Sequence, residues 1–370
     1  MAFKVLATDS DGRTTRFSMR RPDNWHGHVR QGIQMRSVVA ASAQVYGRMT
    51  IMPNTGPVMT VAEAELYQDQ IVSALVEKGL SAERAERFPQ MTLYLHRGMT
   101  DEIRRAKTNQ IIGVKFYPKN PTHGTTGSQA GVPSLQEVDE ELQALDHYQV
   151  PLLVHGESAR HSDILDLERR FVEEQLAPVM QKYPDLPLVV EHATTKEAIE
   201  FVVRAPPNVT ATITPQHLWY SLNSLFEGGL RPFRYCLPLY KHAEDQAALI
   251  KAAISGNPKF CAGDDTAPHP ERGPKGKAKL ADCGCAGAYV APVSVPMYAQ
   301  AFEKAGALDE RFEAFMSVNG AKTRHLPLNT DEIVLERKPW KVPESYGYGN
   351  SDIVVPLCAG EELAWQVVQS

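Results

Sequence analysis

Two histidines and an arginine lie at alternate positions near the N-terminus, in the stretch Trp25-His26-Gly27-His28-Val29-Arg30. Alternate side chains of an extended strand point to the same side, so His26, His28 and Arg30 are predicted to share one face. Two neutral imidazoles on one strand would give a zinc-like ion two of its ligands. The planar guanidinium beside them could bind a substrate carboxylate. A His-X-His pair alone is weak evidence, because such pairs are also common on protein surfaces.

More residues of the kinds that bind metals or substrates follow apolar runs further along the chain. Each run has the length of a short buried strand, and each candidate lies at or near its end. Taken singly they have ordinary explanations, such as a solvated charge for Lys115 or an N-cap for Asp265. Taken together, those coincidences are improbable. The candidates that join the first two histidines are Asn54, Lys115, His155, His192 and Asp265.

The elements that must position these residues alternate between strands and helices. The apolar runs are nearly continuous, which is typical of parallel strands that are buried on both faces. After the stretch at Trp25, strands are predicted over 47–54, 91–95, 111–118, 150–155, 188–192, 209–214 and 259–265. Helices are predicted over 61–78, 101–107, 135–147, 162–182, 196–203 and 245–255.

About eight such units predict an α/β fold, the TIM (β/α)8 barrel, with short additional N- and C-terminal segments and a single domain over residues 1–370. The tail after Thr330 is expected to add a strand or two outside the barrel, and Pro268 to Ala281 to form a mobile surface loop. An open doubly wound sheet is the rival fold, but the Gly-rich turn that it needs after an early strand is missing. Because the C-terminal ends of barrel strands meet at one face, the barrel would gather the candidates into one site.

Composition limits the partners. The net charge of -5 is mild and both signs are interspersed, so neither nucleic acid nor a membrane surface is expected as a partner. No apolar stretch has the length of a signal peptide core or a membrane span. Five cysteines without an export signal favour reduced thiols and a cytoplasmic location. Cys283 and Cys285 could be half of a zinc site, but no second pair completes it.

The mixture of four histidines, one lysine and one carboxylate suits zinc or a similar divalent ion, and could hold two ions. Lys115 is the unusual member, because a protonated amine is repelled by a metal. A lysine that has reacted with carbon dioxide becomes an anionic carbamate with two oxygens. Such a group could bridge two metals separated by roughly 3.5 to 4 Å.

At this point the chain resembles dihydroorotase of the short bacterial and fungal (class II) type, a member of the amidohydrolase superfamily. The resemblance covers nearly the whole chain in the right order. It rests on Arg21-Pro22-Asp23-Asn24-Trp25-His26-Gly27-His28-Val29-Arg30, Met52-Pro53-Asn54, Met91-Thr92-Leu93-Tyr94-Leu95, Lys115-Phe116-Tyr117-Pro118, Leu153-Val154-His155-Gly156-Glu157, Glu191-His192-Ala193-Thr194-Thr195-Lys196, Thr214-Pro215-Gln216-His217-Leu218, Tyr235-Cys236-Leu237-Pro238, Asp265-Thr266-Ala267-Pro268-His269 and Cys283-Gly284-Cys285-Ala286-Gly287.

The resemblance implies a homodimeric zinc enzyme of pyrimidine (UMP) biosynthesis that interconverts N-carbamoyl-L-aspartate and L-dihydroorotate. It implies two zinc ions per subunit, with carboxylated Lys115 as the bridge. A hydroxide that bridges the metals would attack the ring carbonyl, and Asp265 would act as general base and then general acid. The implied metal ligands are His26, His28 and Asp265 for the first ion, and His155 and His192 for the second.

The resemblance also implies how the substrate is bound. Arg30, Asn54 and His269 would bind its carboxylate, and the main chain at Leu237 and Ala286 would contact the ring. His155 would also touch the substrate. A mobile loop carrying Thr125 and Thr126 would close over the site and exclude water.

The chain departs from the family pattern in a few places. Asn24 and Gln31 replace acids that usually flank the first histidines. Pro121 and His123 lengthen the loop before Thr125, and residues 273–279 lengthen the segment after His269.

Two other functions are considered. A hydantoinase or allantoinase could use the same metals on another ring, but the carboxylate-binding groups Arg30, Asn54 and His269 would then be left unpaired. A barrel that serves only as a scaffold would usually lack several metal ligands, and none is missing here. His217 is interpreted as a structural hydrogen-bonding residue near the site in preference to a further ligand, and Cys236 and Cys261 as core residues.

Overall fold

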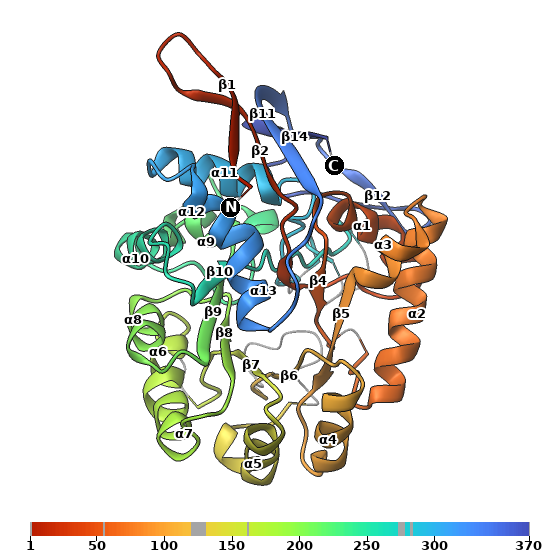
Figure 1. Ribbon diagram of the computed structural model, residues 1–370, viewed down its shortest axis with the longest axis vertical. Coiled ribbons are helices and arrows are strands. Elements are labelled where there is room, and N and C mark those ends of the chain that lie inside the picture. The colour runs from red at the N-terminus through yellow and green to blue at the C-terminus, as the bar shows by residue number, and fades with distance from the viewer. Residues whose placement is uncertain are drawn as a thin grey trace.

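The computed structural model describes residues 2–54, 56–119, 131–160, 163–272, 278–281 and 284–369. Its centre is a sheet of eight parallel strands in the order β10-β9-β8-β7-β6-β5-β4-β3, which confirms the predicted TIM barrel (Figure 1). The strands are β3 (Asn24–Gly27), β4 (Met49–Ile51), β5 (Pro89–Tyr94), β6 (Gly113–Phe116), β7 (Leu152–His155), β8 (Leu188–Glu191), β9 (Val209–Ile213) and β10 (Phe260–Ala262).

The barrel closes where the first and last strands meet, just beyond β10. Gly27 and Thr266 form a parallel bridge. The Asp265 amide donates to the His26 carbonyl at 3.0 Å, and the His28 amide donates to the Thr266 carbonyl at 2.9 Å. The seam of the barrel therefore joins two of the predicted ligand segments through their main chains.

Helices surround the strands, as Figure 1 shows. They are α1 (Gly32–Val45), α2 (Val61–Glu77), α3 (Ala82–Arg87), α4 (Thr100–Thr108), α5 (Asp139–Tyr148), α6 (Leu167–Phe171), α7 (Ala177–Lys182), α8 (Lys196–Arg204), α9 (Pro215–Trp219), α10 (Ala243–Ala253), α11 (Ser294–Lys304), α12 (Glu310–Glu313) and α13 (Asn319–Thr323). Short 3₁₀ helices cover Leu135–Glu137, Leu222–Leu225 and Pro232–Arg234, and π-helical turns cover Val172–Leu176 and Ala314–Val318.

Local sequence explains why helices begin where they do. The Thr60 hydroxyl accepts from the Glu63 amide at 3.2 Å, and the Glu63 carboxylate accepts from the Thr60 amide at 3.0 Å, which is a capping box at the start of α2. The Thr195 hydroxyl caps α8 by accepting from the Ala198 amide at 3.2 Å. The strands β7 and β9 are buried along their whole length, as their mostly apolar and β-branched residues predict, and β3, which carries Asn24 and His26, is buried as well.

Segments from both ends of the chain form a second sheet beside the barrel. It contains β1 (Lys4–Thr8), β2 (Thr14–Arg20), β11 (Glu332–Lys341) and β14 (Glu362–Gln369) in the order β1-β2-β11-β14, and all neighbours are antiparallel. A small pair, β12 (Tyr346–Tyr348) and β13 (Asp352–Val354), lies between β11 and β14 in the chain. The predicted additional terminal segments are confirmed, and they pair with each other. The β1–β2 hairpin projects from the molecule in Figure 1.

Three local predictions need correction. β3 ends at Gly27, and Arg30 has a φ of 63°, so Arg30 does not lie on an extended strand with the two histidines. The helix predicted from Ser162 begins at Leu167 and is interrupted by a π-helical turn. In the segment predicted as a surface loop, Ala278 and Lys279 are buried, because both are hydrogen-bonded to the segment around Cys285 that follows.

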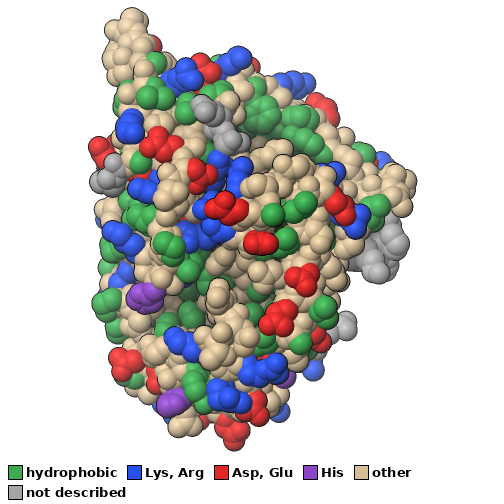
Figure 2. All heavy atoms as spheres, turned by 45° about the vertical axis from the view of Figure 1, so that its right-hand side comes forward, with side chains coloured by type: hydrophobic (Ala, Val, Ile, Leu, Met, Phe, Trp, Pro, Cys, Tyr) green, Lys and Arg blue, Asp and Glu red, His purple; other side chains and the backbone are tan. Residues whose placement is uncertain are grey.

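Charged side chains of both signs are mixed over the face in Figure 2, in keeping with the mild net charge. None of the helices among the described residues has the length and apolar composition needed to span a membrane.

Candidate active site

A cavity opens at the C-terminal ends of the barrel strands. It brings together all the sequence-predicted metal and substrate residues within the described ranges except Lys115, which is fully buried beside it. Tyr117, Ala267 and Gly287 also line it and were not predicted. The lining residues are His26, His28, Arg30, Asn54, Tyr117, His155, His192, Leu237, Asp265, Ala267, His269, Ala286 and Gly287.

Three predicted ligands converge at the barrel seam. The Nε2 atoms of His26 and His28 each lie 3.2 Å from Asp265 Oδ1, and all three side chains are buried. Burial alone would raise the pKa of Asp265, but the two imidazoles hold that pKa well below its ordinary value. This group of nitrogen and oxygen atoms matches the ligand chemistry of zinc.

A glycine makes this approach possible. A Cβ at Gly263 would lie 2.9 Å from Thr212 Cβ, closer than real Cβ contacts come, and 3.0 Å from His26 Cβ, which is tighter than most. The end of β10 can therefore pass close to β3, and Asp265 follows in a left-handed conformation with a φ of 49°.

Glu191 is a buried acid that the sequence analysis did not single out. Its Oε1 lies 3.0 Å from His26 Nδ1, and its Oε2 accepts a hydrogen bond from Lys115 Nζ. Burial would raise the pKa of Glu191, but His26 and Lys115 lower that pKa to about 2. A fully buried lysine requires a neighbouring anion, so the predicted position of Lys115 was the signal that could have revealed Glu191.

The other two predicted ligands lie on the next strands. The ring centroids of His155 and His192 are 4.8 Å apart, and His192 lies equally far from His26. His155 Nε2 lies 2.7 Å from Glu157 Oε2. His192 Nδ1 is buried and has no hydrogen-bond partner among the described residues. Burial is the main cause that holds the pKa of His192 well below its ordinary value, and the positive charge of Lys115 adds to it. The ring of His192 is therefore neutral.

The buried histidines and acids have the chemistry of metal ligands. A neutral, buried imidazole with an unpaired nitrogen is the form that binds metal ions. His192 supplies that nitrogen, and His26 and Glu191 place further ligand atoms within reach of it. The residues therefore fit a metal centre.

The predicted substrate residues form a second cluster beside this centre. Arg30 Nε donates to the Pro268 carbonyl at 2.7 Å, and Arg30 Nη2 lies 2.9 Å from His269 Nε2. His269 Nε2 is also 3.0 Å from the Ala286 carbonyl, and Asn54 Oδ1 is 2.8 Å from His28 Nδ1. Burial, and to a smaller extent the positive charge of Arg30, hold the pKa of His269 well below its ordinary value. A buried guanidinium beside hydrogen-bonding side chains suits an anionic substrate group.

A buried lysine joins the main-chain walls that carry Leu237 and Ala286. Lys279 Nζ donates to the carbonyls of Tyr235, Cys285 and Gly287 at 2.8, 2.9 and 2.9 Å. Burial lowers the pKa of Lys279 to about 7. Lys279 falls in the stretch predicted as a surface loop, because main-chain acceptors leave no trace in the sequence.

Two other predictions concern residues around the cavity. His217 Nδ1 lies 2.6 Å from Thr214 Oγ1 and His217 Nε2 lies 3.0 Å from the Pro238 carbonyl, which fits the structural role and not that of a ligand. Asn24, which replaces a usual acid, donates to Asp264 Oδ1 at 2.7 Å and accepts from the Asp264 amide at 2.9 Å. An acid there would face the buried Asp264 carboxyl, whose pKa burial raises to about 6. Thr125, Thr126 and Cys283 lie outside the described residues.

Comparisons with known proteins agree with this geometry. No family model matches the chain. Dihydroorotase from Laribacter hongkongensis is 45% identical over 354 residues, which cover 95% of this chain and 98% of that protein. An L-hydantoinase from Arthrobacter aurescens has a TM-score of 0.75 with 16% identity, so its likeness shows the fold alone.

Two solved dihydroorotases are similar in structure. The crystal structure from Campylobacter jejuni has a TM-score of 0.84 with 30% identity and covers 99% of this chain and 100% of that chain. The Saccharomyces cerevisiae enzyme in complex with 5-fluoroorotic acid has a TM-score of 0.83 with 26% identity, and the match covers 96% of this chain and 99% of that chain. With relatives of this identity matched over nearly their full length, the chain belongs to the dihydroorotase family of the amidohydrolase superfamily.

Proposed function

We propose that this protein is a dihydroorotase that uses two zinc ions to interconvert N-carbamoyl-L-aspartate and L-dihydroorotate, releasing water in the cyclisation, as a step of pyrimidine biosynthesis. The observation that carries the proposal is the meeting of six predicted ligands beside a buried arginine. These ligands, all buried around one end of the barrel, are His26, His28, Lys115, His155, His192 and Asp265.

The proposed metal ligands divide into two groups. His26, His28 and Asp265 would hold the first ion, and His155 and His192 the second. When bound, zinc polarises a substrate carbonyl and lowers the pKa of water. Lys115 would bridge the ions as a carbamate: its neutral amine attacks carbon dioxide, an N–C bond forms, and one proton is released. The nitrogen keeps one hydrogen, and Glu191 Oε2 is the acceptor already beside it.

The chain's own residues would bind the substrate and move the proton. Arg30, Asn54 and His269 would bind the carboxylate, His155 would touch the substrate, and the main chain at Leu237 and Ala286 would orient the ring. In hydrolysis, Asp265 Oδ1 would take a proton from the attacking water and pass it to the ring nitrogen as the C–N bond breaks. Cyclisation would reverse these transfers. We also propose that Thr125 and Thr126 close over the substrate.

Wider properties of the protein belong to the same proposal. A single working domain over the whole chain, a homodimer, a cytoplasmic location, and the lack of nucleic-acid and membrane partners are all expected from the sequence. The composition and the resemblance support them. The cluster of Arg30 and His269 favours a substrate with an acidic ring over the uncharged rings of hydantoinase substrates. With an uncharged ring, the buried guanidinium of Arg30 would have no anion to bind.

The decisive experiment measures metal content by elemental analysis and dihydroorotate hydrolysis by ultraviolet absorbance. Wild type should contain about two zinc ions per chain, the number that a bridged pair requires. Lys115→Ala should lose both metal and turnover, whereas the exposed-lysine control Lys107→Ala should keep both. Metal without turnover of dihydroorotate would indicate a different cyclic amide. If wild type showed no metal and no turnover, the scaffold function would be supported.

A further inference from the structure

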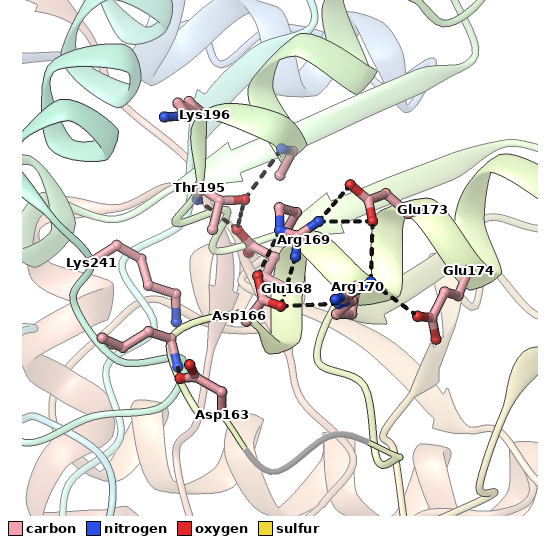
Figure 3. A network of polar contacts seen from close by, with 12 residues as sticks. Asp163, Asp166, Glu168, Arg169, Arg170, Glu173, Glu174, Thr195, Lys196 and Lys241 are labelled. Atoms are coloured by element: carbon pink, nitrogen blue, oxygen red, sulfur yellow. Dashed lines mark hydrogen bonds and ion pairs between the residues drawn. The ribbon is translucent and has the colours of Figure 1, made fainter.

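Glu168 is a buried acid on α6 that has no part in the proposed chemistry. Its Oε2 accepts from the Thr194 amide at 2.9 Å and hydroxyl at 3.0 Å, and from the Thr195 amide and hydroxyl at 2.6 Å each. Its Oε1 is 3.0 Å from the Thr194 amide. Figure 3 shows Glu168 and Thr195 facing each other across the gap between α6 and the start of α8.

The two threonines belong to the turn that carries His192. His192 has a φ of 40°, a left-handed conformation that is strained for a histidine. On its N-terminal side the turn is fixed by the His192 amide, which donates to Thr212 Oγ1 at 2.8 Å. On its C-terminal side Glu168 binds both residues after Ala193. Glu168 therefore helps to hold His192 in a conformation that its own chain does not favour.

The same turn of α6 also contacts the segment that follows His155. The Ser158 amide donates to the Leu167 carbonyl at 3.0 Å. A Cβ at Gly156 would lie 3.5 Å from the Phe171 ring and 3.9 Å from Glu168 Cγ, so α6 packs directly against this segment. One short helix thus supports the residues that follow both His155 and His192.

The choice of a carboxylate is itself informative. Glu168 is fully buried, and its acceptors serve two amide and two hydroxyl donors. Above about pH 7, where Glu168 is ionised, its carboxylate only accepts, whereas a glutamine would turn one donating amide toward the Thr194 amide. The exposed face of α6 is different: Arg169 and Arg170 pair there with Asp166 in partly exposed contacts (Figure 3). Such exposed pairs contribute little to stability.

We propose that Glu168 is a positioning residue that fixes His155 and His192 in the geometry needed for the second metal ion. The inference rests on the proposed role of these histidines as ligands. It predicts a selective effect, because α6 makes these contacts on the side of His155 and His192, whereas His26, His28 and Asp265 are joined by the barrel seam.

The test compares Glu168→Gln with the matched control Glu313→Gln. Glu313 is also fully buried and accepts from the amides of Ala2 and Phe3 at 2.8 and 2.9 Å, which ties α12 to the N-terminal segment and not to a ligand. Each full-length protein is stripped with a chelator and titrated with zinc in bicarbonate buffer, and the bound ions are counted by elemental analysis and calorimetry.

Glu168→Gln should retain one tightly bound ion and bind the second at least about tenfold more weakly, the usual effect of losing a group that orients a ligand. Glu313→Gln should bind both ions as wild type does. Wild-type affinity for both ions in Glu168→Gln, or equal weakening of both, would overturn the proposal. If Glu168→Gln does not fold, Thr194→Val removes one donor at the same contact and should weaken the second ion selectively.

The outcome is separable from that of the proposed function. If wild type binds two ions but does not hydrolyse dihydroorotate, the proposed function fails and the role of Glu168 can still be measured. If wild type binds no zinc at all, both fail.

Discussion

His26 and His28 contact a shared carboxylate directly, whereas His155 and His192 take their support from residues outside the predicted ligand set. In the first group both imidazoles lie 3.2 Å from one oxygen of Asp265. In the second, His155 lies against Glu157, and the segments that follow both histidines lie against α6.

The physical origin of the difference is the position of each group in the barrel. The first group straddles the seam, where main-chain hydrogen bonds between β3 and the residues after β10 close the sheet. Its geometry is therefore inseparable from barrel closure. The second group lies at the ends of β7 and β8, and a separate helix supports the loops that follow. A substitution in that helix is therefore expected to alter the geometry of the second group while the barrel stays closed.

The largest expected effect comes from removing the carboxylate of the first group. Asp265→Asn should lower dihydroorotate hydrolysis by about 10³-fold or more, because the proposed proton acceptor and a metal ligand are lost together. Ultraviolet absorbance measures the rate, and elemental analysis measures the metal. The exposed Asp163→Asn serves as control. Activity within tenfold of wild type in Asp265→Asn would contradict the role of Asp265.

Glu191→Gln should affect both groups. Glu191 contacts His26 and Lys115, so loss of its charge should weaken binding of both ions, roughly 10- to 100-fold in affinity. Zinc titration of the stripped protein measures this. Weakening of only one ion would show that the two groups are independent even at Glu191.

Lys279→Met should affect substrate binding and spare both metal groups. It removes a donor from the carbonyls of Cys285 and Gly287, a loss of about 1–3 kcal/mol for each carbonyl left unsatisfied, and lets the walls at Leu237 and Ala286 move apart. The Tyr235 carbonyl loses Lys279 as well but keeps the Gly287 amide at 3.0 Å. We expect KM for dihydroorotate to rise about tenfold with metal content unchanged, as roughly 1.4 kcal/mol would give.

The matched control is Lys259→Met. Lys259 Nζ also caps main-chain carbonyls, those of Val202, Val203 and Ala205 at the end of α8, away from the cavity. Its loss should reduce stability without changing KM. An unchanged KM in Lys279→Met would disprove the positioning of the wall by Lys279.

The smallest effect concerns the pH dependence of stability. Burial raises the pKa of Glu168 from its ordinary 4.5 to about 7, although Lys241 and the threonine donors partly counter it. Between these values the folded protein retains a proton that the unfolded chain has released. This contribution to stability is therefore complete below about pH 4.5 and is lost as the pH rises through 7.

Thermal unfolding of wild type and Glu168→Gln between pH 5 and 8 measures this contribution as a difference. Wild type should lose stability relative to the variant as the pH rises, at roughly 1.4 kcal/mol per pH unit at most. Other buried acids, such as Asp264, cancel in the comparison. A difference that does not change with pH would show that Glu168 keeps an ordinary pKa.

Residue type and order alone determined the barrel and the predicted ligand set. Nearly continuous apolar runs specify parallel buried strands, and eight of them without the Gly-rich turn of an open doubly wound sheet favour a barrel, whose strand ends share one face. His155, His192 and Lys115 were predictable because each is a chemically distinctive side chain at such an end. The turn at Arg30 was not predictable, because its left-handed φ of 63° occurs at an arginine and not at a glycine or asparagine, the residues that usually indicate this conformation.

Tertiary structure alone decided which groups support the predicted ligands. Glu168 meets Thr194 across 26 residues of chain, and Glu191 meets Lys115 across 76. Lys279 binds main-chain carbonyls, which every residue possesses and which therefore leave no pattern in the sequence. A ligand is recognised by its own chemistry, but a supporting residue is defined by what folding places beside it.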